Sequence, residues 1–260
     1  MLRSLYIAKT GMDSSQFRLD VVSNNLANVN TTGFKKSRAV FEDLMYQVLR
    51  QPGSQSANNT QVPTGLMVGT GAAPVATDRM FQQGNTQQTE NPLDVAINGR
   101  GFLRFQMPDG TIGYSRDGNL KLDSEGRIVN SNGYLLDPPI TVPSNSTKLT
   151  ISQNGLVQTS VPGSTAASDL GTIQLADFVN PQGLESVGQN LFLETAASGG
   201  PVTGDPGANG IGTVMQGYVE ASNVNVTEEL INMIQAQRSY ELNSRGVKTS
   251  DEMLQRLSQL

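Results

Sequence analysis

Both ends of this chain carry an apolar stripe at helical spacing, and the middle does not, which limits the possible folds more than any other feature. Near the N-terminus the stripe takes every third or fourth residue, and six of its seven members are apolar. They are Leu5, Ala8, Met12, Ser15, Leu19, Val22 and Leu26. Alternating steps of three and four residues are typical of a helix that packs along one side in a coiled coil. The polar run that ends at Gly33 predicts the end of this helix.

A second stripe covers the C-terminal residues, with Asn243 and Ser250 in its gaps. Its apolar members are Val226, Leu230, Met233, Ala236, Tyr240, Val247, Leu254 and Leu257. Asn225, followed three residues later by Glu228, resembles a capping box, so a helix is predicted over residues 226–258. An intramolecular helical hairpin is one interpretation of the two stripes, and packing between subunits is the other. Because two isolated helices bury little apolar surface against the entropy of ordering them, we hypothesise that both ends are disordered in the monomer and fold on assembly.

The middle of the chain is predicted to form short strands joined by turns. Strand-like runs at 102–106, 111–115, 119–122, 127–130 and 134–136 are separated by tripeptides that end in Asp-Gly, Glu-Gly or Asn-Gly. Such turns at this spacing indicate hairpins. Residues 149–157 contain another turn of this kind, and 171–179 and 191–194 are further strand-like runs.

Two segments between the N-terminal helix and these strands stay open. Residues 34–50 fit either a helical face or a strand. Residues 51–77 contain no charged residue and are rich in Gly and Pro, so they are either a flexible linker or a stretched segment laid against neighbouring molecules.

The expected fold class is therefore α+β, with long N- and C-terminal α-helices packed together as a coiled-coil-like layer and a β-rich central domain inserted between them. We expect residues 1–33 and 218–260 to form a terminal helical assembly domain. Residues 34–90 would be an extended connector, 91–198 a β-rich outer domain, and 199–217 a return linker.

Catalytic chemistry has little support in the composition. The chain has no His and no Cys, which removes the commonest general base, the thiolate nucleophile and the usual zinc ligands. Adjacent carboxylates such as Glu42 and Asp43 have no third ligand nearby, and no phosphate-binding or dinucleotide-binding glycine motif is complete. The net charge of −5 provides no basic face for nucleic acid. We therefore predict a structural protein, not an enzyme, without cofactor or metal.

Charged residues interrupt the N-terminal segment, so no signal peptide is predicted, and no apolar run is long enough for a transmembrane helix. The expectation is export without cleavage, and no direct insertion into a membrane.

Three motifs resemble those of the flagellar rod and hook axial proteins. The first runs from Asn24 to Lys35 (NNLANVNTTGFK), the second from Asn91 to Phe102 (NPLDVAINGRGF), and the third contains QGYVE from Gln216 and SNVN from Ser222. All three stand in the family's order, so the resemblance spans the whole chain. The motif residues it singles out are Asn25, Leu26, Ala27, Asn28, Thr31, Gly33, Phe34 and Lys35, and Gly217, Tyr218, Ser222, Asn223 and Val224.

Within this family the chain has the length of a rod subunit. Its segment around Gln51, Pro52, Gly53, Pro63 and Gly65 resembles the stretch special to the distal rod. The resemblance implies a subunit that polymerises helically into a straight, rigid, hollow drive shaft, which transmits motor torque to the hook. The stripe residues would then pack between subunits, and the segment around Pro52 would stiffen the rod. The implied partners are other copies of the chain, proximal rod proteins, the hook protein, the peptidoglycan and outer-membrane ring proteins, and the type III export apparatus. The implied location is the basal body, across the periplasm.

Two alternatives remain at this stage. Another axial subunit, from the proximal rod or the hook, would share the motifs but is expected to lack the 51–71 segment. A secreted β-rich binding module would leave the helical stripes at both ends unexplained.

Overall fold

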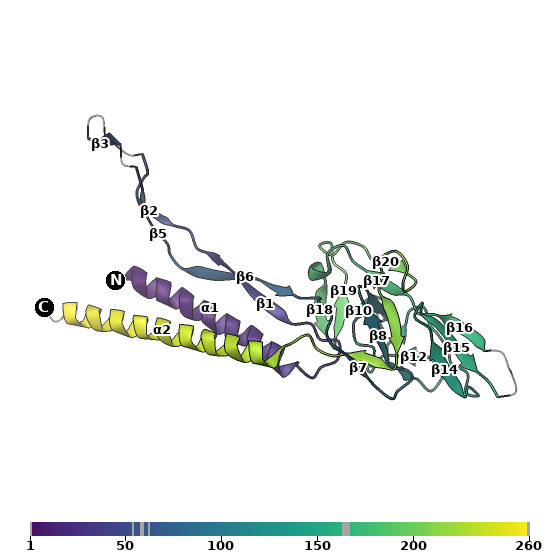
Figure 1. Ribbon diagram of the computed structural model, residues 1–260. Coiled ribbons are helices and arrows are strands. Elements are labelled where there is room, and N and C mark those ends of the chain that lie inside the picture. The colour runs from purple at the N-terminus through teal and green to yellow at the C-terminus, as the bar shows by residue number, and fades with distance from the viewer. Residues whose placement is uncertain (1, 54, 58–59, 62, 163–166, 259–260) are drawn as a thin grey trace. The chain divides into compact units, whose positions relative to one another are not determined.

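A computed structural model of the chain describes residues 2–53, 55–57, 60–61, 63–162 and 167–258 (Figure 1). It divides into two compact units. The helical unit comprises Met1–Ala27, Ser37–Asp78 and Asn225–Leu260, and the β unit comprises Asn28–Lys36 and Arg79–Val224. Long helices at the two ends and a β-rich middle confirm the α+β class.

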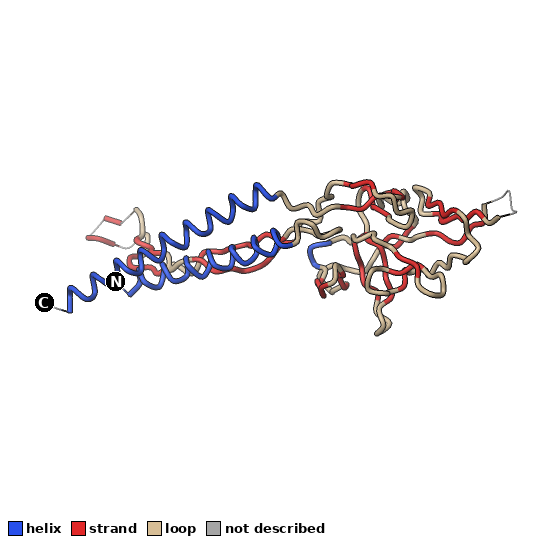
Figure 2. Tube along the Cα trace, turned by 90° about the horizontal axis from the view of Figure 1, so that it is seen from below, coloured by secondary structure: helices blue, strands red, loops and turns tan. Residues whose placement is uncertain are grey.

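Two helices, α1 (Leu2–Ala27) and α2 (Val226–Ser258), lie side by side in the helical unit (Figures 1 and 2). The bounds of α2 are those predicted. Its N-terminus is capped as expected, because Oδ1 of Asn225 accepts the backbone N–H groups of Thr227 at 3.0 Å and Glu228 at 3.4 Å. Neither helix, within its described residues, is long and apolar enough to cross a membrane.

The rest of the helical unit is one long hairpin of three nested antiparallel strand pairs, β1 with β6, β2 with β5 and β3 with β4. Its strands are β1 (Ser37–Asp43), β2 (Gln47–Arg50), β3 (Gln55–Ala57), β4 (Thr60–Gln61), β5 (Leu66–Val68) and β6 (Ala72–Arg79). Residues 37–43 and 47–50 are thus strand, and no part of 37–50 is helix. The uncharged segment folds back on itself through backbone pairing, so it does not behave as an unpaired linker.

Residues 34–90, predicted to form one connector, are divided between the two units. Residues 37–78 belong to the helical unit, and 34–36 and 79–90 belong to the β unit. Strand β1 packs on α1, where the rings of Phe17 and Phe41 meet edge to face with centroids 6.4 Å apart. This aromatic contact fixes the base of the hairpin on the helix.

The β unit is built from one nine-stranded sheet, a three-stranded sheet and two strand pairs. The large sheet has the order β11-β12-β13-β9-β10-β19-β18, and β17 joins β9 to β20; β14-β15-β16 form the small sheet, and β8 pairs with β21 and β7 with β22. The bounds are β7 (Thr86–Gln88), β8 (Val95–Asn98), β9 (Phe102–Gln106), β10 (Ile112–Ser115), β11 (Lys121–Leu122), β12 (Ile128–Val129), β13 (Leu135–Leu136), β14 (Lys148–Ile151), β15 (Leu156–Ser160), β16 (Ser168–Thr172), β17 (Leu175–Asp177), the 3₁₀ turn η1 (Pro181–Gly183), β18 (Glu185–Gly188), β19 (Leu191–Leu193), β20 (Val202–Gly204), β21 (Thr213–Gln216) and β22 (Tyr218–Glu220).

The side chains of strand β9 point alternately into two separate clusters of the core of this unit. Leu103 and Phe105 enter an aliphatic cluster, whereas Phe102 enters an aromatic cluster with Tyr114 and Phe178. Successive side chains of a strand point to opposite faces, so one strand supplies both clusters.

Three of the four predicted turns in the first part of the β unit are hairpins, with Gly110, Gly126 and Gly133 in the positive-φ conformation. The turn at Arg116-Asp117-Gly118 is not, because β10 pairs with β9 and β19 and not with β11. Gly118 lies so close to the backbone of Val95 that a Cβ atom there would stand 1.6 Å from the carbonyl oxygen. Arg116, at the start of this segment, belongs to a buried polar network with Glu220.

Candidate assembly surfaces and signature network

The contacts between α1 and α2 recur at seven-residue steps. The hydroxyl oxygens of Ser4 and Ser250 are 3.4 Å apart, and Gly11 faces the amide of Asn243, which would lie 2.7 Å from a Cβ atom at position 11. Farther along, Nδ2 of Asn25 donates to Oε2 of Glu229 at 3.3 Å. Each advance of seven or fourteen residues along α1 is matched by an equal retreat along α2. The helices therefore run antiparallel with a constant register.

On α1 the structure brings the predicted packing positions to the covered side of the helix. Val22 is 5% exposed, and the other apolar members of the stripe are half-buried. Those members are Leu5, Ala8, Met12, Leu19 and Leu26.

On α2 the predicted positions divide into two groups. Met233, Val247 and Leu254 are half-buried and Ala236 is buried, whereas Val226, Leu230 and Tyr240 are 41%, 44% and 40% exposed. The side chain of Leu257 lies outside the described part of the chain. Sequence reasoning missed Glu229, which is 4% exposed and faces Asn25. A glutamate that directly follows another, Glu228, gave no signal of burial in the sequence.

Asn25, in the first motif, fastens the hairpin to α1. Its side chain is 1% exposed and exchanges two hydrogen bonds with the backbone of Ser37, from Nδ2 to the carbonyl at 2.8 Å and from the amide N–H to Oδ1 at 2.9 Å. Two bonds to the backbone N–H and C=O of one residue fix Ser37, the first residue of β1, directly. Its motif neighbours Leu26 and Ala27 are half-buried and exposed.

The outer part of the hairpin, from Met45 to Met67, exposes a group of large apolar side chains. Among its described residues Met45, Tyr46, Val48, Leu49, Leu66 and Met67 are 48–87% exposed. Of the positions assigned to rod stiffening, Gln51, Pro52, Gly53 and Pro63 are exposed and Gly65 is half-buried. The hairpin brings Pro52 and Gly65 together, because a Cβ atom on Gly65 would lie 2.7 Å from Cδ of Pro52. Position 65 therefore has no space for a side chain, because Pro52 and the backbone of Arg50 lie too close.

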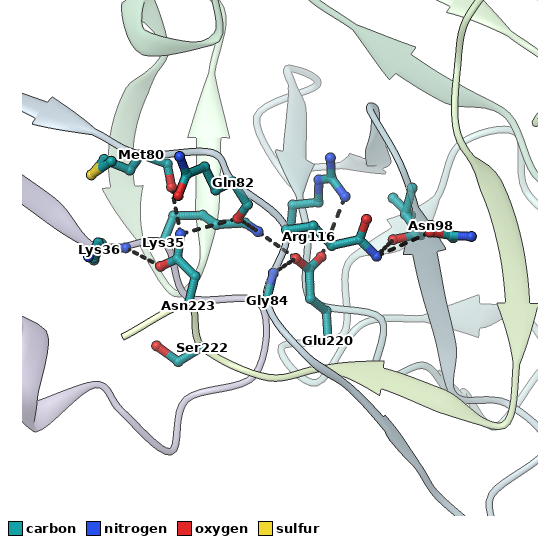
Figure 3. A network of polar contacts seen from close by, with 12 residues as sticks. Lys35, Lys36, Met80, Gln82, Gly84, Asn98, Arg116, Glu220, Ser222 and Asn223 are labelled. Atoms are coloured by element: carbon teal, nitrogen blue, oxygen red, sulfur yellow. Dashed lines mark hydrogen bonds and ion pairs between the residues drawn. The ribbon is translucent and has the colours of Figure 1, made fainter. Parts of the chain in front are cut away.

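In the β unit, the first and third motifs meet at a buried ion pair. Nζ of Lys35 lies 2.5 Å from Oε1 of Glu220, and neither side chain is exposed (Figure 3). Nζ also donates to the carbonyl of Gln82 at 2.7 Å. Burial lowers the pKa of Lys35 below its usual value, and the carboxylate of Glu220 opposes that shift.

Glu220 accepts from three directions. Besides Lys35, the backbone N–H of Gly84 donates to Oε1 at 2.8 Å, and Nη1 of Arg116 lies 3.4 Å from Oε2. Arg116 is 4% exposed and also donates to the carbonyl of Gly99 at 2.7 Å. Burial lowers its pKa, an effect that Glu220 and Asp177 oppose. The carboxylate is thus held by two cations and an amide.

Asn223, in the third motif, binds backbone groups of Lys36, which follows the first motif, and of the segment that contains Met80 and Gln82. Its Oδ1 accepts the N–H of Lys36 at 2.7 Å, and its Nδ2 donates to the carbonyls of Met80 at 2.8 Å and Gln82 at 3.1 Å (Figure 3). A side-chain amide that completes three backbone bonds between separate segments acts as a structural tie. Its neighbour Ser222 accepts the N–H of Val224, a buried residue, at 3.4 Å.

The motif glycines permit close backbone contacts. Gly33 has φ +68°, its N–H donates to the carbonyl of Glu220 at 2.8 Å, and a Cβ atom would lie 2.6 Å from the backbone nitrogen of Asp117. Gly217 has φ +75°, and its N–H donates to the carbonyl of Asp94 at 2.7 Å. Both positions need a residue without a side chain.

The remaining motif residues complete this region. Asn28 accepts from Thr31 through backbone and side chain, both at 3.2 Å; Phe34 is 8% exposed; and Tyr218 pairs with Gln88 between β22 and β7. The motifs therefore mark a tightly packed polar junction inside the β unit. Within the described residues no group of three or more acidic, His or Cys side chains could hold a metal ion.

Family comparisons match three regions of the chain, near the N-terminus, in the middle and at the C-terminus. Residues 5–35 match the flagella basal body rod protein family, 96–159 the flagellar hook protein FlgE/F/G D1 domain, and 215–260 the flagellar basal body rod FlgEFG protein C-terminal domain.

Full-length relatives agree with these matches. The chain is 54% identical to the flagellar basal-body rod protein FlgG of Buchnera aphidicola subsp. Schizaphis graminum, over all of both chains. It is 46% identical to FlgG of Borreliella burgdorferi, over 98% of this chain and 97% of the relative. It is 38% identical to FlgG of Bacillus subtilis, over 100% and 99%.

Proposed function

The chain belongs to the family of flagellar basal-body rod proteins named FlgG, and from this membership we propose that it polymerises helically into the distal rod, a straight and hollow drive shaft that transmits torque to the hook. As a member of this family it is a structural component of the flagellar basal body and not an enzyme.

The observation that carries the assembly proposal is the antiparallel register of α1 and α2. Contacts spaced by seven and fourteen residues favour coiled-coil-like packing of the two ends, in which each stripe keeps one side against its partner. Val226, Leu230 and Tyr240 remain 40–44% exposed in the single chain, so they are free to pack between subunits. Head-to-tail contacts that do not close into a ring generate a helical filament.

The hairpin supplies the stiffening element of the proposal. Its outer strands expose large apolar side chains, and residues 51–77 carry no charge that burial would have to desolvate. Such a surface suits a contact with a neighbouring copy better than contact with water. A bridge of this kind would block the sliding between subunits that lets a shaft bend.

The same proposal sets the location and the partners. The rod would span the periplasm after type III export without a cleaved signal peptide. Its ends would meet proximal rod proteins and the hook protein, and its outer surface would turn inside the peptidoglycan and outer-membrane rings. The alternative, a proximal rod or hook subunit, is not favoured, because relatives named FlgG match over the full chain.

Electron microscopy of the purified protein at rising concentration tests the proposed function. Straight, hollow tubes are the expected result, and helical reconstruction would then locate residues 51–77. A protein that stays monomeric at all concentrations would contradict polymerisation.

A further inference from the structure

Helix α2 carries an aliphatic cluster on the side that faces away from α1. Leu230, Ile231 and Ile234 are 44%, 51% and 56% exposed. Ala236, which is 1% exposed, marks the opposite side, since two residues turn the helix by about 200°. Three large side chains within two turns form an apolar patch that no described residue of this chain covers.

A second feature of the helical unit is an open groove lined mainly by small side chains, with Arg18 and Phe41 beside them. It has a volume of about 270 Å³ and runs between α1 and α2 beside the base of the hairpin. Ser14, Ser15, Ala72, Ala236 and Ser239 contribute to its wall. Because a cavity of ~150 Å³ already admits benzene, the groove has room for aliphatic side chains.

The serines of α1 make this groove less polar than its composition suggests. The hydroxyl of Ser14 donates to the carbonyl of Thr10 at 2.8 Å, and that of Ser15 donates to the carbonyl of Gly11 at 2.8 Å. Hydroxyls that already bond their own helix can be covered by apolar groups at little cost in lost hydrogen bonds. The aromatic ring of Phe41 supplies an apolar end to the groove.

The symmetry of a polar filament decides how such surfaces can be covered. All copies point the same way, so contacts are heterologous and a patch cannot cover itself as it would across a two-fold axis. The aliphatic cluster needs a different surface on the next copy. Ser239 and Ile234 are separated by about 140° around α2, so the cluster and the groove lie on different sides of one helix.

We propose that Leu230, Ile231 and Ile234 of one copy pack into the groove beside Ser14, Ser15 and Ser239 of the next copy. This inference rests on the proposed polymer and specifies one of its lateral contacts. Large aliphatic side chains on one copy fill a groove that five small side chains line on the other copy, together with Phe41 and with Arg18, whose guanidinium lies over the Phe41 ring. When every copy makes this contact with the next one, successive copies are added around the filament axis in one rotational direction.

Cysteine cross-linking tests this contact directly, because the chain has no cysteine of its own. The double variant Ile234→Cys/Ser239→Cys should give a ladder of disulfide-linked oligomers under assembly conditions. A mixture of the two single variants should give a covalent dimer that contains one copy of each. Within one chain these positions are five residues apart on a helix, and their side chains diverge too far for a disulfide.

The matched control is Ile234→Cys/Glu241→Cys, in which the second cysteine is exposed, lies about 200° around α2 from Ser239, and is too far along the helix from position 234 for a disulfide within one chain. It should give little ladder. In addition, Ile234→Ser should raise the concentration required for assembly roughly tenfold or more, as expected when a buried aliphatic contact is lost.

The outcomes separate the two proposals. Tubes that form without a ladder from Ile234→Cys/Ser239→Cys, or with an equal ladder from the control, overturn the lateral contact and leave the rod function intact. Failure of the unsubstituted protein to assemble contradicts the rod function itself, and this contact with it.

Discussion

Lys35 and Glu220 form an ion pair of 2.5 Å between two side chains that are completely excluded from solvent, although 185 residues separate them in the sequence. One belongs to the first family motif and the other to the third. The pair therefore joins the segment by which the chain enters the β unit to the strand by which it leaves.

Glu220→Gln should strongly destabilise the β unit. The variant leaves Lys35 and Arg116 buried without their carboxylate, and loss of one partner of a buried pair costs ~3–5 kcal/mol. Urea denaturation followed by circular dichroism measures the change. Glu125→Gln is the matched control, because Glu125 pairs with Arg127 at the surface and is 68% exposed, so its loss should cost at most about 1 kcal/mol. Equal losses in the two variants would argue against a structural role for the buried pair.

Gly33→Ala should destabilise the β unit more than Gly110→Ala. Both glycines have positive φ, +68° and +84°, which costs a residue with a side chain ~1–2 kcal/mol. Only at position 33 would the new Cβ atom also meet backbone, at 2.6 Å from the nitrogen of Asp117; nothing lies within 4 Å at position 110. Thermal unfolding of the two variants measures the difference. A Gly110→Ala variant that is the less stable of the two would contradict the packing described here.

Alkaline pH should weaken the β unit through Tyr114. Burial, with a contribution from Glu194, raises the pKa of Tyr114 to about 12, against an ordinary value of 10.0. Between these values the unfolded chain has lost the proton and the folded chain has kept it. Stability is therefore fully present below pH 10 and falls as pH rises toward 12, by about 2.7 kcal/mol at most.

Tyr114→Phe should flatten this part of the curve of unfolding free energy against pH. Burial lowers the pKa of Lys35, which acts in the opposite sense below 10.5, but that contribution is common to both proteins and cancels in their difference. Curves of equal slope above pH 10 would show that Tyr114 titrates normally.

Hydrogen exchange tests whether the chain ends fold only on assembly. In dilute monomer the amides of residues 5–26 should exchange almost as fast as in an unfolded peptide, and in assembled tubes they should be protected. The physical reason is that one helix pair buries too little surface to offset the entropy of ordering both ends. Strong protection in the monomer would instead show that contacts such as Asn25 with Glu229 suffice.

Deletion of residues 54–66 should give curved or flexible rods. The deletion removes β3, β4 and Leu66 from the end of the hairpin proposed to bridge neighbouring copies, while the helices that form the tube remain. Electron microscopy of assembled protein measures curvature, and replacement of the same residues by a Gly/Ser segment of equal length separates loss of contact from loss of length. Straight tubes from the deletion variant would refute the stiffening role.

Much of the fold follows from local pattern. The 3-4 spacing and the Asn225 cap gave α2 its bounds, Val226–Ser258, and glycines after Asp, Glu or Asn gave the hairpins around β9 to β13. The turn at Arg116-Asp117-Gly118 was predicted wrongly as a hairpin, because the buried bond from Arg116 to Glu220 outweighs a local turn preference.

The sequence by itself determined what depends on neighbours along the chain: helix period, strand alternation, turns that need glycine, and the motifs that identify the family. Tertiary structure decided which distant segments meet. It placed residues 37–78 as a hairpin on α1, turned Leu230 and Ile234 away from that helix, and enclosed Lys35 with Glu220. A lysine in a polar motif looks the same in sequence whether it is solvated or buried, because burial depends on the partner that the fold brings to it.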